Sequence, residues 1–262
     1  MKLLGFFAVL VFVFNAYSQT DRDRKAWIAS VIGGSKSKPS VTDKNRILKF
    51  DFAPLWTRLD DNDSVLGYIG TNYQRMRIAI ISATRDPKQP DTFHVTGKSM
   101  VKNVVRPFTG TMKITEVASA RGKALEDDYA ADQVKEAGFV FGEYHFLEDP
   151  KQTNTGKFDG VFKTDWIVDK DGKFLYDEVL MGADGYYNNQ FLGTWTSYKT
   201  KAKKPASWGD SRIPVSGDLD IGAGEFAPDS KYIRNGWQGH QAAYGPKQDK
   251  RALAEENRQW WK

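Results

Sequence analysis

The chain has 262 residues, of which 40% are hydrophobic, 13% aromatic and 27% charged, a composition typical of a globular protein and not of a disordered or collagen-like chain. Cysteine is absent, which excludes disulfides, thiolate metal sites and a cysteine nucleophile. The formal net charge is +5, but the two signs alternate along most of the sequence, so composition alone does not require a large basic surface.

The first eighteen residues have the pattern of a secretory signal peptide. A positive residue precedes an apolar run over 3–14, and Ala16 and Ser18 stand where signal peptidase reads small side chains. The run is shorter than the roughly 20 residues that cross a bilayer. We therefore predict a signal peptide over 1–18, a lead-in segment over 19–45 and no transmembrane span after cleavage. A cysteine-free exported chain suggests a bacterial protein that is secreted, periplasmic or on the outer cell surface.

Eight segments between residues 46 and 199 have the composition of β-strands. They are rich in Phe, Val, Thr, Tyr and Trp and are bounded by Gly, Pro, Asn or Asp. The predicted strands are 46–52, 73–83, 93–101, 108–117, 138–147, 157–168, 173–181 and 190–199. The sequence Asp-Lys-Asp-Gly at 169–172 predicts a tight hairpin, because Asp-Gly accepts the positive φ of such a turn. We predict an all-β domain over 46–200, an antiparallel eight-stranded barrel, with a β-sandwich as the alternative.

Two segments have the pattern of helices. Residues 124–136 predict a short helix between two strands, and residues 247–261 predict a C-terminal helix. The stretch over 201–245 contains many Gly, Pro and Asp residues together with several large apolar residues. We therefore expect 201–262 to be an irregular segment with a short C-terminal helix, packed on the barrel.

Three predicted strands contain the pattern Phe-x-Gly followed by a bulky residue. The glycines are Gly110, Gly160 and Gly193. Phe and Gly two residues apart face the same side of a strand, where a glycine permits a bend or the close passage of a neighbouring strand. The pattern therefore indicates a repeated device for closing a small barrel. Chance recurrence in a chain with 23 Gly and 16 Phe is the alternative.

The sequence FLGTW at 191–195 resembles the Gly-x-Trp strand of calycins, the lipocalin and avidin-like barrels, in which the Trp closes one end. The longer segment NNQFLGTW at 188–195, together with GYIGTNYQR at 67–75 and WGDSRIP at 208–214, resembles an uncharacterised family of secreted bacterial proteins with calycin-like barrels. In lipocalins the motif lies in the first strand, whereas here it lies in the last predicted strand. The resemblance therefore implies a fold, and it brings neither ligand residues nor an activity.

Metal and cofactor chemistry has little support in the sequence. None of the three histidines has another histidine two or four residues away. Asp218, Asp220 and Glu225 lie in a glycine-containing stretch and could converge on a hard cation, although a solvated acidic turn is the alternative. No Walker loop, Gly-x-Ser-x-Gly elbow or dinucleotide fingerprint is present, so we predict no cofactor and no resident metal.

Paired carboxylates are the best enzymatic option in the sequence. Glu143 lies on a predicted strand, and Asp165 and Asp177 lie on the two strands of the Asp-Gly hairpin. Two carboxyl groups that face each other across a cleft could hydrolyse a glycoside. Acidic residues on the outer face of a sheet are the alternative.

Tryptophans give the binding hypothesis its support. Trp166, Trp195, Trp208 and Trp237 could stack on a sugar or enclose an apolar ligand at a barrel mouth, or they could close the barrel as core residues. Lysines at 199–204 end the last predicted strand, where an anionic glycan or lipid headgroup could bind, or where they could be solvated. With an export signal, nucleic acid is not an expected partner.

We therefore expect a secreted, non-catalytic β-barrel protein that binds a small ligand, a glycan or an envelope partner. The alternatives are a glycan hydrolase and a purely structural surface module. A deep aromatic cavity would favour the ligand binder, a groove with two carboxylates would favour the hydrolase, and a filled interior would favour the structural module.

Overall fold

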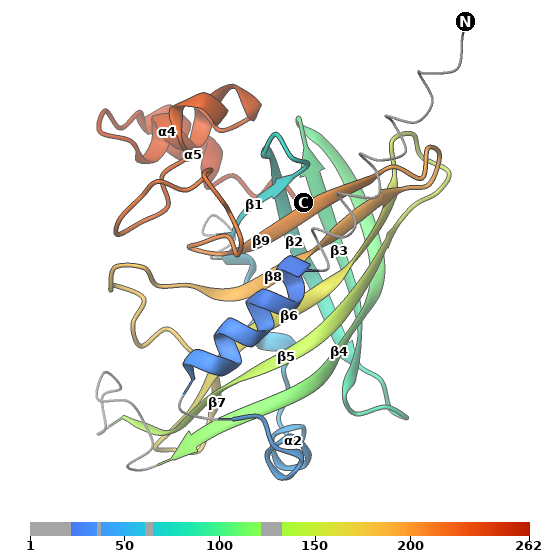
Figure 1. Cartoon of the computed structure of the whole chain (residues 1–262), viewed down its shortest axis with the longest axis vertical. Coiled ribbons are helices and arrows are strands. Elements are labelled where there is room, and N and C mark those ends of the chain that lie inside the picture. The colour runs from blue at the N-terminus through green and yellow to red at the C-terminus, as the bar shows by residue number, and fades with distance from the viewer. Residues whose placement is uncertain (1–21, 36–37, 61–64, 122–132) are drawn as a thin grey trace, which may run out of the picture.

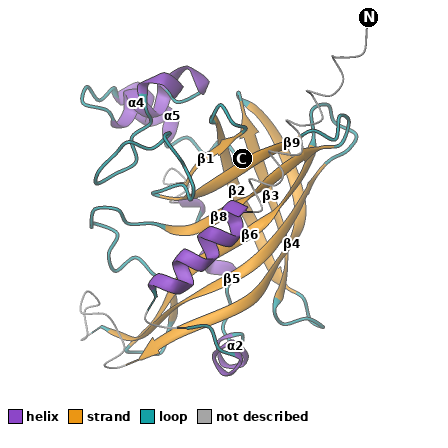
Figure 2. Ribbon diagram, viewed as in Figure 1, coloured by secondary structure: helices purple, strands orange, loops and turns teal. Residues whose placement is uncertain are grey.

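A computed structural model describes residues 22–35, 38–60, 65–121 and 133–262 (Figure 1). They form a large antiparallel sheet with one longer helix across its outer face and short helices around it (Figure 2). The strands are β1 (Val65–Ile69), β2 (Gln74–Arg85), β3 (Thr92–Val101), β4 (Val104–Arg121), β5 (Val134–Glu148), β6 (Gly156–Asp169), β7 (Phe174–Tyr176), β8 (Asn188–Ser197) and β9 (Lys203–Asp210). The helices are α2 (Val41–Ile47), α3 (Ala53–Trp56), η3 (Ser230–Asn235), α4 (Gln238–Tyr244) and α5 (Lys250–Glu256), and 22–34 is also helical. None of the described helices is long and apolar enough to cross a membrane.

Hydrogen bonds join eight of the strands into a ring. The order is β5-β4-β3-β2-β1-β9-β8-β6, and β5 pairs in turn with β6. Strand β7 pairs with β6 outside the ring. The ring is uneven, because β1 has 5 residues and β4 has 18. Each ring strand has a partner on both sides, which removes most of the exposed edges of an open sheet.

The ring has two different ends, because consecutive antiparallel strands run in opposite directions. The β1–β2, β3–β4, β5–β6 and β8–β9 turns lie together at one end, which we call the hairpin end. Helix α2 lies at the opposite end (Figure 1), where α3 packs against β2 and β7, and we call this the α2/α3 end. The helix over 22–34 crosses the outer face of the sheet, where Trp27 packs edge-on against Phe141 of β5 with ring centroids 5.6 Å apart.

Aromatic side chains fill the inside of the ring. Buried hydrophobic residues from all eight ring strands, together with residues of α2 and α3, form a single cluster. Its largest fully buried members include Phe93, Phe108, Phe146, Phe158, Phe162, Trp166 and Trp208. The centre of the ring is therefore a packed core.

Glycines make room for these aromatic rings. Several interior glycines stand directly opposite an aromatic residue of the neighbouring strand, in the pairs Gly67/Trp208, Gly97/Phe108, Gly110/Phe146, Gly138/Trp166, Gly142/Phe162 and Gly160/Tyr144. A Cβ atom added at any of these glycines would come within 3.0 Å of neighbouring atoms. Gly193 pairs with Gly160 and lies beside the Tyr144 hydroxyl. The close strand passage predicted at Gly110, Gly160 and Gly193 is therefore confirmed.

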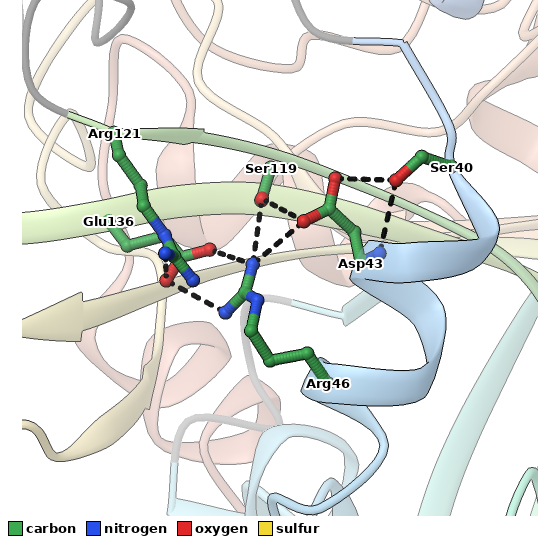
Figure 3. A network of polar contacts seen from close by, with 6 residues as sticks. All are labelled: Ser40, Asp43, Arg46, Ser119, Arg121 and Glu136. Atoms are coloured by element: carbon green, nitrogen blue, oxygen red, sulfur yellow. Dashed lines mark hydrogen bonds and ion pairs between the residues drawn. The ribbon is translucent and has the colours of Figure 1, made fainter.

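A polar network fixes α2 across the α2/α3 end (Figure 3). Arg46 of α2 donates to both carboxylate oxygens of Glu136 in β5, at 2.5 and 3.0 Å, and to Ser119 of β4 at 3.0 Å. Asp43 accepts from Arg46 at 2.8 Å and from Ser40, the helix N-cap, at 2.7 Å. Burial opposes the ionisation of Asp43, but these hydrogen bonds outweigh it and lower the pKa of the carboxyl. The network positions Ile47, α3 and the intervening turn over the core.

The C-terminal segment packs on the outside of the ring. Residues 213–237 contribute Ile213, Leu219, Phe226 and Trp237 to a second hydrophobic cluster with Leu66 and Tyr68 of β1. The last turn after α5 buries Trp260 and Trp261 against β2 and β3. Arg75 of β2 forms a nearly buried ion pair with Glu256 of α5, and its Nη1 lies 2.8 Å from Oε1. The residues after β9 therefore lie against β1, β2 and β3.

Several predicted strands are confirmed, but the N-terminal one is wrong. The segment predicted as a strand over 46–52 ends α2 and forms a turn before α3. Ser40 begins α2 by accepting from the Asp43 amide, and a proline lies in the first turn of α3, so local capping overrides the apparent alternation. The predicted strand over 173–181 is reduced to β7, and the hairpin at 169–172 is confirmed, with Gly172 at φ 82°.

Two ring strands were not predicted. Strand β1 has only five residues, too few to show a clear alternation. Strand β9, over 203–210, lies in the segment expected to be irregular, and its lysines and proline concealed it. The predicted helix over 124–136 lies mostly outside the described residues, and its described end, 134–136, begins β5.

Candidate functional site

The tryptophans proposed as ligand contacts are all buried. Trp166 and Trp208 lie in the core of the ring, and Trp237 is in the second cluster under the C-terminal segment. Trp195 is 9% exposed, and its indole donates to Glu148 at 3.0 Å near the hairpin end. The burial expected for Trp195 is therefore found. Of the four, Trp208 alone lines the pocket described below.

The three candidate carboxylates do not share a groove. Glu143 is exposed on the outer face of β5, opposite Val161. Asp165 lies four residues further along β6, about 13 Å away at 3.3 Å per residue, and pairs with Lys163. Asp177 is buried and adjoins Asp165 through a backbone hydrogen bond of 3.3 Å. The structure thus brings Asp165 and Asp177 together and leaves Glu143 apart.

The acidic residues of the C-terminal segment hold cationic side chains and backbone amides. Asp220 pairs with Arg212 at 2.6 Å, and its other oxygen accepts backbone N–H groups at 3.0 and 3.1 Å. Asp218 pairs with Lys231 at 2.7 Å, and Glu225 is exposed. Among the described residues, no three His, Asp or Glu side chains are arranged to hold a metal ion.

The best-formed site is a pocket at the α2/α3 end of the ring. It is a shallow hollow: the space in which the centre of a water-sized sphere fits is about 30 Å³, and the empty space rises to about 440 Å³ only when the open solvent at its mouth is included. Its lining comes from α3 and the following turn, β1, β2, β8 and β9: Trp56, Arg58, Leu59, Val65, Ile78, Ile80, Asn189, Phe191, Trp208 and Asp210. Aromatic and aliphatic walls therefore surround three polar side chains.

A chain of buried hydrogen bonds forms the polar part of this pocket. The Asp210 carboxylate accepts from the Tyr176 hydroxyl at 2.7 Å and from the Asn189 amide at 3.0 Å. The Asn189 oxygen accepts from Thr164 at 2.9 Å, and Thr164 accepts from the Trp56 indole at 2.9 Å. These groups lie on α3, β6, β7, β8 and β9, so the chain links the capping helix to the ring.

A bulge at the start of β8 creates this arrangement. The pairing of β8 with β9 shifts register between Asn188 and Phe191, and Asn189 has a φ of 43°. Asn tolerates this left-handed conformation better than most residues. Asn188 is fully buried and bonds to the backbone of Asp165 and Asp177, while Asn189 reaches Asp210. The side-chain amides of two adjacent residues thus bind different parts of the fold: Asn188 binds β6 and the residue after β7, and Asn189 binds β9.

Charge and burial perturb the tyrosines around Asp210. Burial, reinforced by the Asp210 carboxylate, raises the pKa of Tyr176 well above its ordinary value. Burial also raises the pKa of Tyr186, whose hydroxyl donates to the Asp177 carbonyl at 2.7 Å. Both hydroxyls therefore stay protonated at physiological pH and act as hydrogen-bond donors.

Arg58 supplies the cationic group of the pocket. Its guanidinium lies 3.9 Å from the ring centroid of Tyr176 and pairs with Glu178 at 3.2 Å. Among the described residues that line the pocket, Asp210 is the single carboxylate and there is no histidine. The described lining therefore provides charged, amide and aromatic groups that can recognise a polar ligand.

Sequence reasoning did not select Trp56, Arg58, Asn189 or Asp210. Asn189 and Asp210 do fall in the segments 188–195 and 208–214, on which the sequence-based expectation of a calycin-like barrel depended, and this was the only available signal. No family model, curated protein or solved structure matches this chain.

Proposed function

We propose that this chain is an exported, non-catalytic protein with a calycin-like β-barrel that binds a small polar ligand of sugar size at the α2/α3 end. The signal-peptide pattern over 1–18 supports export. The ring of eight strands and the buried Trp195 near one end support a calycin-like barrel. The centre of the ring is filled by aromatic side chains, which by itself favours a structural module, so the proposal depends on the pocket at the α2/α3 end and concerns a small ligand.

The observation that carries the proposal is the Asp210–Asn189 pair beside the aromatic walls of the pocket. Carboxylate, amide and guanidinium groups next to indole and phenyl rings are the groups that bind sugar hydroxyls and sugar faces. The bulge at Asn189 supports the same interpretation, because backbone strain at a polar site is often retained for binding.

Glycan-array binding and calorimetry test this proposal with Arg58→Gln as the principal variant. Arg58 lies in the pocket wall and its side chain is 23% exposed, so its replacement leaves the core intact. We expect binding of a mono- or oligosaccharide by the wild type and at least a tenfold loss in Arg58→Gln. Arg258→Gln is the matched control. Arg258 is a surface residue that pairs with Glu255, three residues before it, and it does not line the pocket. Absence of any saccharide binding below millimolar concentration, or equal binding by both variants, would contradict the proposal.

A structural surface module is the second candidate. The observation that favours it is the packed interior of the ring, where all eight strands contribute to a single hydrophobic cluster. Under this alternative the chain of bonds from Trp56 to Asp210 serves only to hold α3 on the ring. Asp210→Asn would then change stability with no ligand to lose, whereas the binding proposal requires loss of saccharide affinity in the folded variant.

A further inference from the structure

The hairpin end carries a concentration of lysines that is larger than the run at 199–204 noted in the sequence. Three turns distant in the sequence contribute them: β3–β4, β5–β6 and β8–β9. The exposed residues are Lys102, Lys151, Lys199, Lys201, Lys203 and Lys204. We call this surface the lysine end.

Hydrogen bonds show that the three turns adjoin one another. The Tyr198 amide of the β8–β9 turn donates to the Thr155 carbonyl of the β5–β6 turn at 3.0 Å. Arg106, just after the β3–β4 turn, donates to the Thr153 carbonyl at 3.0 Å. Beneath them, Trp195 of β8 donates to the Glu148 carboxylate of β5. The lysines therefore project from one connected surface.

Acidic residues do not balance this surface. In the segments 99–106, 148–157 and 197–205 the only acids are Glu148 and Asp149. Glu148 is 4% exposed, and its carboxylate accepts from Ser99 at 2.7 Å and from the Gly156 amide at 2.8 Å in addition to Trp195. Its charge is thus directed into the protein. Asp149 is partly exposed and accepts from the Lys151 amide at 2.9 Å, so one acid of these segments stands against six exposed lysines. The lysine end presents a positive field that attracts polyanions.

The turns themselves are polar. Among the described residues of 149–155 and 198–202, none is an exposed large hydrophobic side chain; two exposed apolar residues flank these turns, Val104 at 46% and Leu147 at 39%. Thr153, Asn154 and Thr200 are exposed beside the lysines and offer hydroxyl and amide groups. A membrane-inserting surface needs apolar side chains at its tips, whereas a hydrated sugar polymer needs hydrogen-bonding groups between the cations.

We propose that the lysine end binds an anionic polysaccharide, a sugar polymer that carries carboxylate or sulfate groups. The polymer lies across the β3–β4, β5–β6 and β8–β9 turns, and its charged groups pair with lysines contributed by different turns. This site is at the opposite end of the ring from the pocket. The proposal for the lysine end is therefore independent of whether a saccharide binds in the pocket.

The test uses heparin as a sulfated probe and polygalacturonate as a carboxylated probe, with affinity measured by calorimetry at 50 and 200 mM NaCl. The variant carries Lys102→Gln, Lys151→Gln, Lys199→Gln and Lys201→Gln. The control carries Lys49→Gln, Lys88→Gln, Lys170→Gln and Lys173→Gln, which are also exposed and lie towards the α2/α3 end. Both variants lose the same net charge, and thermal melts confirm that both are folded.

We expect the wild type and the control to bind at least one probe at 50 mM NaCl. The variant with the four lysine-end substitutions is expected to bind that probe at least tenfold more weakly. Its dependence of log Kd on log salt is expected to be shallower, by about one unit for each lysine that no longer pairs with the polymer. Equal weakening in the two variants, or no binding of either probe by the wild type, overturns the proposal. Binding to vesicles containing phosphatidylglycerol without binding to either polysaccharide also overturns it, in favour of a membrane surface.

Discussion

Replacing Gly110 with alanine tests whether the interior glycines are required for the close packing of strands. Gly110 of β4 stands opposite Phe146 of β5. An added Cβ would overlap the His145 carbonyl oxygen and would lie 2.8 Å from the Phe146 Cα. Both atoms belong to the backbone of the neighbouring strand, which cannot move aside as a side-chain end can.

The expected cost follows from two opposing effects. Overpacking of a close-packed core costs about 1–3 kcal/mol, and a backbone clash belongs at the upper limit. Replacing glycine by alanine also lowers the conformational entropy of the unfolded chain, which stabilises the folded state by up to about 1 kcal/mol. We therefore expect Gly110→Ala to lower the free energy of unfolding by about 2 kcal/mol, or the melting temperature by about 4–8 °C.

Urea unfolding followed by tryptophan fluorescence and circular dichroism measures this difference. Gly182→Ala is the matched control, because Gly182 is exposed and an added Cβ there would have no atom within 4 Å. A Gly110→Ala midpoint equal to that of Gly182→Ala would refute the argument that the glycines make room for the neighbouring strand.

Three further predictions concern stability. Trp195→Ala is expected to lower the free energy of unfolding by about 3–5 kcal/mol, because it leaves a cavity. Trp195→Phe is expected to lower it less, because Phe fills part of the space although Glu148 loses the indole donor. Thermal melts of both variants check this. Burial lowers the pKa of His240 to about 4, whereas in the unfolded chain it is near 6.5. The folded protein therefore loses stability as the pH falls from 6.5 towards 4, because the unfolded chain binds the proton first. Unfolding measured between pH 7 and 4 should show a loss of about 3 kcal/mol that is absent from His240→Gln, and parallel pH profiles would contradict this assignment. Arg46→Gln removes hydrogen bonds to the buried Glu136 and is expected to cost about 2 kcal/mol in urea unfolding, whereas an unchanged midpoint would show that α2 is not held by this network.

The sequence predicted a mainly β, antiparallel fold and most of the strands correctly, because long strands rich in β-branched and aromatic residues have a clear local pattern. It also predicted the Asp-Gly hairpin and the close strand passage at Gly193, since both depend on the conformational freedom or small size of glycine at a single position. The short β1 and the lysine-rich β9 carried no such pattern, and only pairing with their neighbours made them strands. Capping by Ser40 likewise prevailed over the alternation that suggested a strand at 46–52.

Both candidate sites depend on contacts between residues far apart in the sequence. Asp210 meets Asn189 because a bulge at the start of β8 re-aims an amide, and it meets Tyr176 across 34 positions. The lysines of three turns share a surface because alternate connections of an antiparallel sheet lie at the same end. Composition and local periodicity determine which segments become strands, whereas register and ring closure determine which side chains meet, and these long-range pairings are set only when the whole sheet has formed.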